Sequence, residues 1–131
     1  MGSIKEIVFE SDSPLVLARF WMQLLDGYKL RPYDQDDIEH LAKLGLTPET
    51  DPTVLVDGPG PILCFQKVPG RKYENNRLHL DISVVDVQAA TKRIESLGGK
   101  VVRQSTKYTV MCDPEGNQFC IFASRVESVQ N

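Results

Sequence analysis

The amino-acid sequence predicts an α+β fold made of two tandem βαβββ modules. The first observation is an internal repeat, because residues 7–24 can be laid on residues 80–97 without a gap, each segment passing from a strand into a helix. The second is a return to strand patterns after each helix. The third is a composition, 41% hydrophobic and 25% charged over 131 residues, that is typical of one globular domain. We therefore expect one domain, with module one at about 4–68, a linker at about 69–76 and module two at about 77–124.

Each module is predicted to open with a strand that has one apolar and one polar face. In module two the residues alternate with the period of a half-buried strand, Leu78, Leu80, Ile82 and Val84 against His79, Asp81 and Ser83. In module one the same register puts Ile7 and Phe9 on the apolar face and Glu6 and Glu10 on the polar face, with Val8 as an apolar exception. Since helices should pack on the apolar faces, we expect the polar faces to form a concave side that surrounds one pocket.

Both opening strands run into an amphipathic helix. Apolar residues three or four positions apart form the seam of each helix, Pro14, Leu17, Trp21 and Leu24 in the first and Val87, Ala90, Ile94 and Leu97 in the second. Ser13 and Asp86 are suitable N-caps, and Gly27 and Gly98 are suitable C-terminal stops. Because Trp21 falls in the seam, we expect it to pack in the core and not to stack on a ligand.

The remaining strands are separated by turn residues. They are predicted at 28–33, 53–56 and 62–68 in module one and at 100–103, 108–112 and 119–123 in module two. Turn signals at 57–60 and 113–117 precede the last strand of each module. The modules differ at residues 34–51, where the residues around Leu41 predict a short helix that ends near Gly45. We interpret this stretch as an insertion over one end of the sheet.

Charge and cysteine content exclude several classes of protein. The net charge is −3 and the Lys and Arg residues are scattered, so no basic stripe exists for nucleic acid. No apolar run approaches the roughly 20 residues of a spanning helix, and the first residues lack a signal-peptide pattern, so we expect a cytoplasmic protein with no membrane partner. The cysteines, Cys64, Cys112 and Cys120, are odd in number and lack a Cys-x-x-Cys spacing, which predicts reduced thiols. A neutral or cationic small molecule is the partner that this composition favours.

Four stretches resemble the vicinal oxygen chelate superfamily, which contains glyoxalases, bleomycin-resistance proteins and extradiol dioxygenases. They are LARFW at 17–21, FQKVP at 65–69, NRLHLD at 76–81 and DPEGNQFC at 113–120, and together they cover nearly the whole chain. Within the superfamily the sequence is similar to uncharacterised glyoxalase-like proteins. The resemblance implies that the two modules form a cupped, eight-stranded mixed sheet with the helices on its outer face, commonly in a homodimer.

The resemblance also implies positions for a metal. Metal-dependent members place one ligand on the first strand and one on the last strand of each module; His79 matches one of these positions, and Glu6 is its repeat partner. The closing-strand carboxylate of the family is replaced by Cys120, and Cys64 best matches the equivalent position in module one. Zinc accepts all four side chains, but the catalytic metals of the superfamily prefer oxygen and nitrogen ligands. We therefore expect no cofactor, with a divalent metal held by these four residues as the alternative.

Two residues are candidates for catalysis and five for ligand contact. His79 and Glu6 are the catalytic candidates, because an imidazole titrates near neutral pH and the carboxylates expected on the same face, Glu6 and Asp81, can fix its tautomer. A structural hydrogen bond is the alternative role for His79, and an ion pair with Arg77 is the alternative for Asp81. We expect His40, on the inserted helix, to be solvated. The ligand-binding candidates are Gln66, Asp81, Phe122, Cys120 and Cys64, the two cysteines having apolar packing as their alternative.

These observations favour a small-molecule-binding, glyoxalase-like protein of the resistance or sequestration type, which holds its ligand in the cupped sheet. The alternative is a lyase, isomerase or dioxygenase that acts on a small carbonyl-containing or aromatic metabolite. A third hypothesis is an interaction domain with a vestigial cup. Binding ranks first because the carboxylates that the family carries on its closing strands are missing, and these would be the strongest sign of catalysis. Whether the protein is an enzyme stays open, as does whether the cup closes within one chain or across a dimer.

Overall fold

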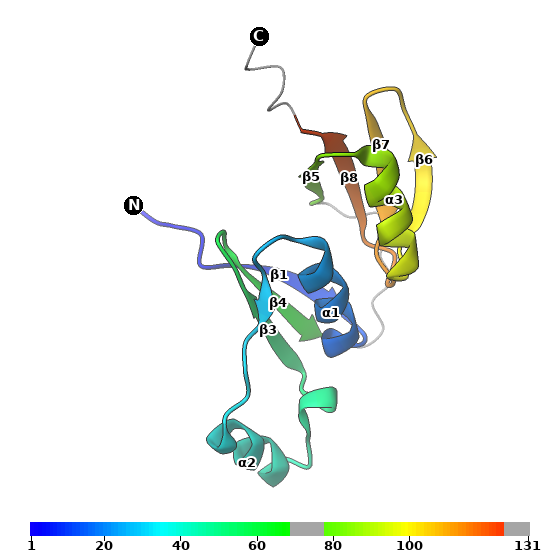
Figure 1. Ribbon diagram of the computed structural model, residues 1–131. Coiled ribbons are helices and arrows are strands. Elements are labelled where there is room, and N and C mark those ends of the chain that lie inside the picture. Colours follow the sequence, from blue (N-terminus) through cyan, green and yellow to red (C-terminus); the bar gives the residue numbers. More distant parts are fainter. Residues whose placement is uncertain (69–77, 125–131) are drawn as a thin grey trace. The chain divides into compact units, whose positions relative to one another are not determined.

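The computed structural model describes residues 1–68 and 78–124, and it divides the chain into two compact units, residues 1–72 and 73–131 (Figure 1). Each unit contains a four-stranded mixed sheet with a helix against one face. The predicted α+β class with two tandem βαβββ modules is therefore confirmed. The expected linker at 69–76 lies outside the described residues.

Unit 1 runs from the first strand to the close of the first module. Its elements are β1 (Glu6–Ser11), α1 (Pro14–Leu24), β2 (Lys29–Leu30), α2 (Gln35–Lys43), the short 3-10 helix η1 (Pro48–Thr50), β3 (Thr53–Asp57) and β4 (Ile62–Lys67). The strand order is β1-β4-β3-β2, with β1 parallel to β4 and the other pairs antiparallel. Residues 31–52 join β2 to β3 and contain α2 and η1; we call this segment the excursion (Figure 1).

The core of unit 1 lies between α1 and the sheet. Trp21 is only 1% exposed, and its ring lies 5.2 Å from that of Phe9 on β1, measured between centroids. Phe9 in turn stacks on Phe65 of β4, at 4.9 Å. Burying one such aromatic side chain contributes roughly 1.5–3 kcal/mol, so this cluster fixes α1 on the sheet. The prediction that Trp21 packs in the core is confirmed.

Unit 2 repeats the topology of unit 1. Its elements are β5 (Leu80–Val84), α3 (Val87–Ser96), β6 (Lys100–Gln104), β7 (Tyr108–Cys112) and β8 (Gln118–Ala123), in the sheet order β5-β8-β7-β6. The register repeats as well, since Val8 pairs with Cys64 across β1 and β4, and its repeat counterpart Asp81 pairs with Cys120 across β5 and β8. The predicted equivalence of the two cysteines is confirmed. Among the described helices none has the length and apolar character needed to cross a membrane.

The helix ends agree with the capping residues in the sequence. The Asp86 carboxylate accepts a hydrogen bond of 3.1 Å from the backbone N–H of Ala89 and so caps α3. Ser13 holds the N-cap position of α1, with Pro14 as the first helical residue, but its side chain makes no capping hydrogen bond. Gly27 and Gly98 adopt φ angles of +78° and +104° just after α1 and α3, a conformation that glycine adopts without strain.

Replacing Asp86 by Ala is expected to lower the free energy of unfolding by about 1 kcal/mol, because the Ala89 N–H loses its partner. Replacing Asp86 by Ser is the matched control, since a serine hydroxyl can still cap the helix. Urea unfolding followed by circular dichroism measures both changes. Equal losses in the two variants would contradict a capping role.

Two predicted details are wrong. Leu78 was expected on the buried face but is 66% exposed, because β5 begins only at Leu80. The strand predicted at 28–33 covers only Lys29–Leu30. In the described sheet it is an edge strand with β3 as its partner. The N–H of Arg31 still donates to the carbonyl of Leu55 at 2.9 Å, but the next residue is Pro32, which has no N–H to continue the ladder.

Candidate functional site

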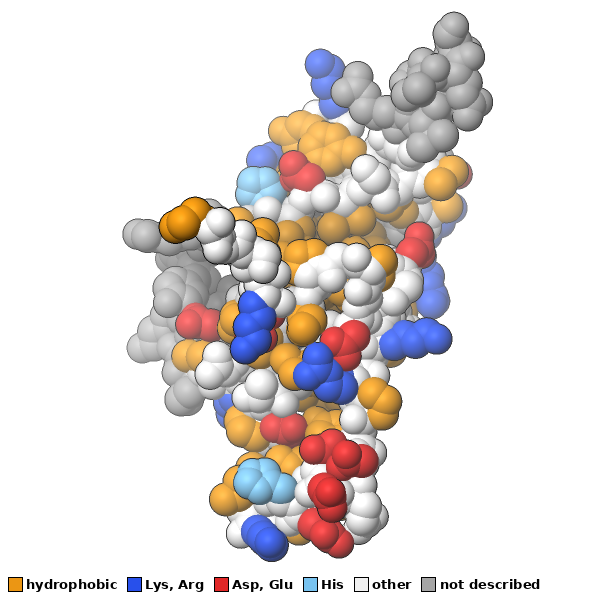
Figure 2. Space-filling model, turned by 90° about the vertical axis from the view of Figure 1, so that its left-hand side faces the viewer, with side chains coloured by type: hydrophobic (Ala, Val, Ile, Leu, Met, Phe, Trp, Pro, Cys, Tyr) orange, Lys and Arg blue, Asp and Glu red, His pale blue; other side chains and the backbone are white. Residues whose placement is uncertain are grey.

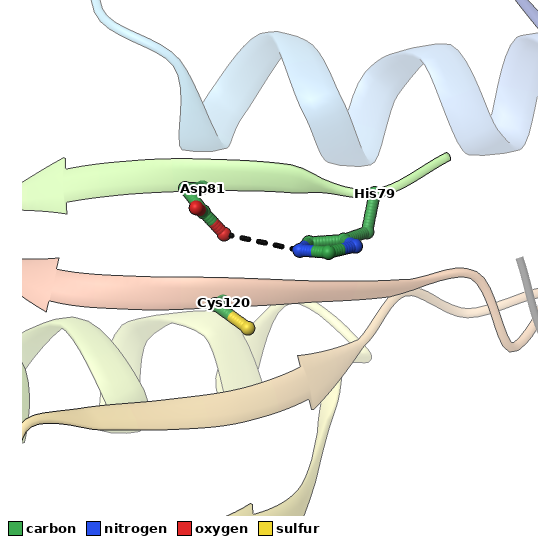
Figure 3. Close-up of side chains that lie close together, drawn as sticks. All are labelled: His79, Asp81 and Cys120. Atoms are coloured by element: carbon green, nitrogen blue, oxygen red, sulfur yellow. Dashed lines mark ion pairs between the residues drawn. The ribbon is translucent and has the colours of Figure 1, made fainter. Parts of the chain in front are cut away.

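His79, Asp81 and Cys120 come together on the sheet face of unit 2 that faces away from α3 (Figure 3). Nε2 of His79 lies 3.4 Å from Oδ1 of Asp81, and one ligand atom from each of the three residues lies within 4.8 Å of the others. His79 directly precedes β5 and is two residues from Asp81, so both side chains project to the same face. Cys120 joins them because β8 pairs it with Asp81. The parallel pairing of β5 with β8 therefore builds the cluster.

The cluster keeps the thiol of Cys120 protonated near neutral pH. Burial raises the pKa of Cys120, and the negative charge of Asp81 and a hydrogen bond to its carboxylate raise it further, while the charge of Arg103 acts in the opposite sense. His79 and Asp81 remain open to solvent, with side chains 56% and 57% exposed. A molecule in solution can therefore reach an imidazole, a carboxylate and a neutral S–H donor within a few ångströms.

An aromatic wall adjoins this polar cluster. Phe122 lies two residues after Cys120 on β8, and so on the same face, and its ring is 5.3 Å from that of Tyr108 on β7. The two residues are paired directly across the antiparallel strands. Sequence reasoning proposed Phe122 but missed Tyr108. Pairing the strands on either side of the turn at 113–117 residue by residue would have found it.

The turn before β8 is held by side chains of the motif that carried the family resemblance. Asp113 is 2% exposed, and its Oδ1 accepts hydrogen bonds of 2.9 Å from the backbone N–H groups of Glu115 and Asn117. Its Oδ2 accepts a third, of 2.8 Å, from the side-chain amide of Asn117. Gly116 has a φ of +88°, which the turn requires. These residues fix the start of β8 and, through it, the position of Cys120.

Unit 1 has a corresponding pair, Glu6 and Cys64. Cys64 is 4% exposed, and burial, followed by the charge of Glu6 and a hydrogen bond to it, raises the pKa of Cys64 to about 11. Arg31 and Asp57 form a two-bond ion pair at 2.9 and 2.7 Å, which raises the pKa of Arg31 and lowers that of Asp57. The charge of Glu6 contributes to the shift of Arg31, so these side chains share one electrostatic environment.

The predicted site residues thus fall into two sets. His79, Asp81 and Cys120 lie together in unit 2, and Glu6 lies with Cys64 in unit 1. Gln66 and Phe122 stand two residues beyond the two cysteines, on the same faces. That both sets line one pocket stays a prediction. His40 is exposed on α2, and Arg77, the alternative partner of Asp81, lies outside the described residues.

The three residues of unit 2 fit a zinc ion by donor type. Zinc accepts imidazole nitrogen, carboxylate oxygen and thiolate sulfur, and ligand atoms around a tetrahedral ion stand roughly 3.4–3.8 Å apart. The 3.4 Å between His79 and Asp81 agrees with that spacing. Cys120 would have to lose its proton on binding, which the carboxylate of Asp81 opposes until the ion arrives. Asp81 was not among the predicted metal ligands, and the predicted set of Glu6, Cys64, His79 and Cys120 stays a prediction.

Comparisons with known proteins agree with this architecture. The family model described as a glyoxalase-like domain matches residues 6–122. No curated protein matches the chain. A glyoxalase/bleomycin resistance protein/dioxygenase family enzyme from Burkholderia phytofirmans is 11% identical with a TM-score of 0.69, over 93% of this chain and 98% of its own. The trypanothione-dependent glyoxalase I of Leishmania major is 16% identical with a TM-score of 0.65, over 99% and 92%.

A glyoxalase-related enzyme from Fulvimarina pelagi is 12% identical to this chain with a TM-score of 0.65, over 96% of this chain and 91% of its own. At these identities the solved structures establish the shared fold. The family model spans nearly all of both modules, including Glu6, Cys64, His79 and Cys120. The chain therefore belongs to the glyoxalase-like domain family, within the vicinal oxygen chelate superfamily.

Proposed function

We propose that the protein binds a small, neutral aromatic molecule with a carbonyl group on the open sheet face of unit 2. The observation that carries the proposal is the cluster of His79, Asp81 and Cys120 next to the ring pair of Tyr108 and Phe122. Ligand sites typically combine an apolar wall with a few polar groups that fix orientation, and this face offers both. The resistance proteins named in the family description of the Burkholderia neighbour make sequestration a fitting role.

Each side chain has a role that follows from its chemistry. Asp81 accepts the hydrogen of one imidazole nitrogen of His79 when the ring is neutral and Nε2 carries the proton, and so orients the ring. When the ring is protonated, its other nitrogen can donate to a ligand carbonyl. The thiol of Cys120 is a weak donor, and the ring of Phe122 offers a stacking surface. Glu6, Cys64 and Gln66 are the corresponding candidates in unit 1.

Binding is favoured over covalent chemistry by the state of the thiol. A nucleophilic cysteine needs a lowered pKa, whereas burial and Asp81 raise the pKa of Cys120. The closing-strand position that carries a carboxylate in metal-dependent members of the superfamily is this same cysteine. Its side chain is therefore suited to contact a ligand as a neutral group.

A zinc-dependent lyase, isomerase or dioxygenase is the second candidate, and the three donor atoms within 4.8 Å favour it. A zinc ion bound there would polarise a substrate carbonyl, while the chain would orient the substrate against Phe122. Elemental analysis of protein purified without a histidine tag or chelator separates the candidates. Stoichiometric zinc that is lost in a Cys120→Ser variant would favour the enzyme. Metal-free protein that binds a neutral aromatic probe, 2-hydroxyacetophenone, would favour the first proposal.

Replacing His79 by Gln is expected to weaken binding of 2-hydroxyacetophenone by roughly two- to tenfold, because one hydrogen bond contributes roughly 0.5–1.5 kcal/mol. This neutral probe carries an aromatic ring, a carbonyl and a neighbouring hydroxyl. Its affinity can be measured from NMR titrations of backbone amides. The matched control is His40→Gln, the same change on α2, which should leave the affinity unchanged. Equal affinity in the wild-type and His79→Gln proteins would remove His79 from the site.

The predicted homodimer and the cytoplasmic location remain proposals of the same kind. Homodimers are common in the superfamily that the sequence resembles, and β1 and β5 are edge strands of their sheets, a position at which another chain can extend a sheet. Sedimentation of the purified chain at several concentrations tests the dimer. A single species with the mass of one chain at every concentration would contradict it.

A further inference from the structure

A pocket lies within unit 1, between the excursion that carries α2 and the edge of the sheet. Its volume is about 460 Å³, within the range of small-molecule sites. One wall is formed by Pro32 and Tyr33, which follow β2, and another by residues of α2 and the loop after it. The excursion ends where the chain enters β3, and Thr53 and Leu55 of this strand close the pocket. Residues 34–51, the stretch that distinguishes module one from module two, therefore build this cavity. The described part of module two has no corresponding segment.

This pocket is separate from the candidate site described above. Its lining includes none of the clustered residues, which are Glu6, Cys64, His79, Asp81 and Cys120. The residues that line it belong to the stretch after β2, to α2, to the segments on either side of η1 and to β3. A ligand bound there would accordingly need chemistry of its own.

One side of the pocket is apolar. Leu41 is 7% exposed and packs inward from α2, while Leu44, just past the helix, is 62% exposed at the pocket. Leu46 and Leu55 extend the apolar lining. A capping box between Asp34 and Asp37 fixes the start of α2 and so its leucine-bearing face. Covering an exposed leucine with an organic group is favourable by roughly 25 cal/mol per Å² of apolar area removed from water.

The other side of the pocket is acidic. Tyr33 donates a hydrogen bond of 2.8 Å to Oδ2 of Asp51, and Oδ1 of Asp51 accepts the backbone N–H of Thr53 at 3.0 Å. Both donors are neutral, so neither offsets the negative charge of the carboxylate, and the carboxylate oxygens retain further acceptor positions. Burial, the hydrogen bond to Asp51 and the charges of Asp51, Asp37 and Glu49 all raise the pKa of Tyr33. Burial is the largest of these causes, and the three acidic side chains add a negative potential at the hydroxyl.

The arginine side chain in the pocket lining does not offset this negative potential. Arg31 lines the pocket, but its guanidinium is engaged by Asp57 through two hydrogen bonds, at 2.9 and 2.7 Å. His40 also lines the pocket, and acidic side chains gather over this end of unit 1 in Figure 2. With Asp37 and Asp51 on the wall, a positively charged group is the complement of the polar side.

We propose that this pocket binds a small organic amine, with its ammonium group on Asp51 and its apolar body against Leu44 and Leu46. The ammonium donates to the open acceptor positions of the carboxylate, next to the Tyr33 hydroxyl that holds Asp51 in place. The hydrocarbon part covers leucine side chains that water now contacts. Charge and apolar area together select an amphiphilic cation over a neutral or anionic analogue.

The test uses the full chain and three probes of one shape: 2-phenylethylammonium, neutral 2-phenylethanol and anionic phenylacetate. NMR titration of backbone amides measures the affinity of each probe and the residues that respond. The cation is expected to bind at least about fivefold more tightly than the alcohol, with shifts centred on residues 33, 44 and 51, and phenylacetate is expected not to bind there. Equal affinities for the cation and the alcohol would overturn the proposal.

Two variants and a matched control locate the charge. Asp51→Asn should weaken cation binding about fivefold and leave the alcohol unchanged, whereas Asp36→Asn, the same change at a position of α2 outside the lining, should have no effect. Leu44→Arg puts a cation at an exposed position of the pocket and should abolish binding of the amine without disturbing the fold. If Asp51→Asn does not fold, the Leu44→Arg result decides. Retained binding in Leu44→Arg, or an equal loss in Asp36→Asn, would contradict the site.

Discussion

Replacing Asp113 by Ala is expected to lower the free energy of unfolding by about 3 kcal/mol or more. The carboxylate is buried and accepts three hydrogen bonds, two from backbone N–H groups and one from the side chain of Asn117. Removing it leaves these donors without their acceptor in a turn with little access to water, and each buried donor left unpaired costs roughly 1–3 kcal/mol. Chemical denaturation followed by circular dichroism measures the change.

Two further variants serve as references for the size of this loss of stability. Asp113→Asn keeps an oxygen for the two backbone donors but presents an amide nitrogen to the side-chain amide of Asn117, so its loss should be smaller. Glu95→Ala, on the exposed face of α3, should change stability by less than about 0.5 kcal/mol. If Asp113→Ala unfolds at the same denaturant concentration as Glu95→Ala, the turn does not depend on the carboxylate.

The thiol of Cys64 is expected to titrate near pH 11, which reduces its thiolate fraction at pH 8 about 100-fold relative to a cysteine with a pKa of 9. Burial is the largest cause, and the charge of Glu6 adds to it. Since the folded state holds the proton more tightly than the unfolded chain, the thiol stabilises the fold fully below about pH 9. That contribution is lost as the pH rises through 11.

Glu6→Gln should lower the pKa of Cys64, because it removes the negative charge that disfavours the thiolate. The matched control is Glu10→Gln, which removes the same charge from the same strand and the same face, on the other side of Val8, the residue paired with Cys64. The carbon-13 shift of Cys64 Cβ, followed against pH in a Cys112→Ser, Cys120→Ser background, gives the midpoint. A midpoint that moves as far in Glu10→Gln as in Glu6→Gln would contradict the assignment.

The features of the fold that are encoded locally could be predicted from the sequence. The seam of α1 around Trp21, the cap of α3 at Asp86 and the glycine after each helix depend on spacing within one segment. The family resemblance supplied the match between Cys64 and Cys120, which the strand registers confirm. The end of β2 was misjudged because an edge strand is limited by its one partner, and the paired residues of that partner lie 26 and 28 positions later in the chain.

The site was predicted only in part, because its geometry depends on pairings between distant strands. Asp81 and Cys120 were both candidates, but their contact follows from the register of β5 with β8. The sequence offered both Glu6 and Asp81 as carboxylate partners of His79, and the structure places Asp81 beside it. The pocket beside α2 was not predicted at all. It depends on the hydrogen bond from Tyr33 to Asp51, which closes the excursion across 18 residues and has no periodic signal in the sequence.

The chain has two histidines, and their imidazole nitrogens provide the most direct test of the proposed ligand site. Long-range proton–nitrogen correlation spectra resolve the rings of His79 and His40 in the uniformly labelled protein. When 2-hydroxyacetophenone is added, the nitrogens of His79, which lie beside Asp81 and Cys120, are expected to shift in proportion to occupancy while those of His40 stay in place. Saturable binding that moves His40 and leaves His79 unchanged would place the ligand elsewhere and contradict the account.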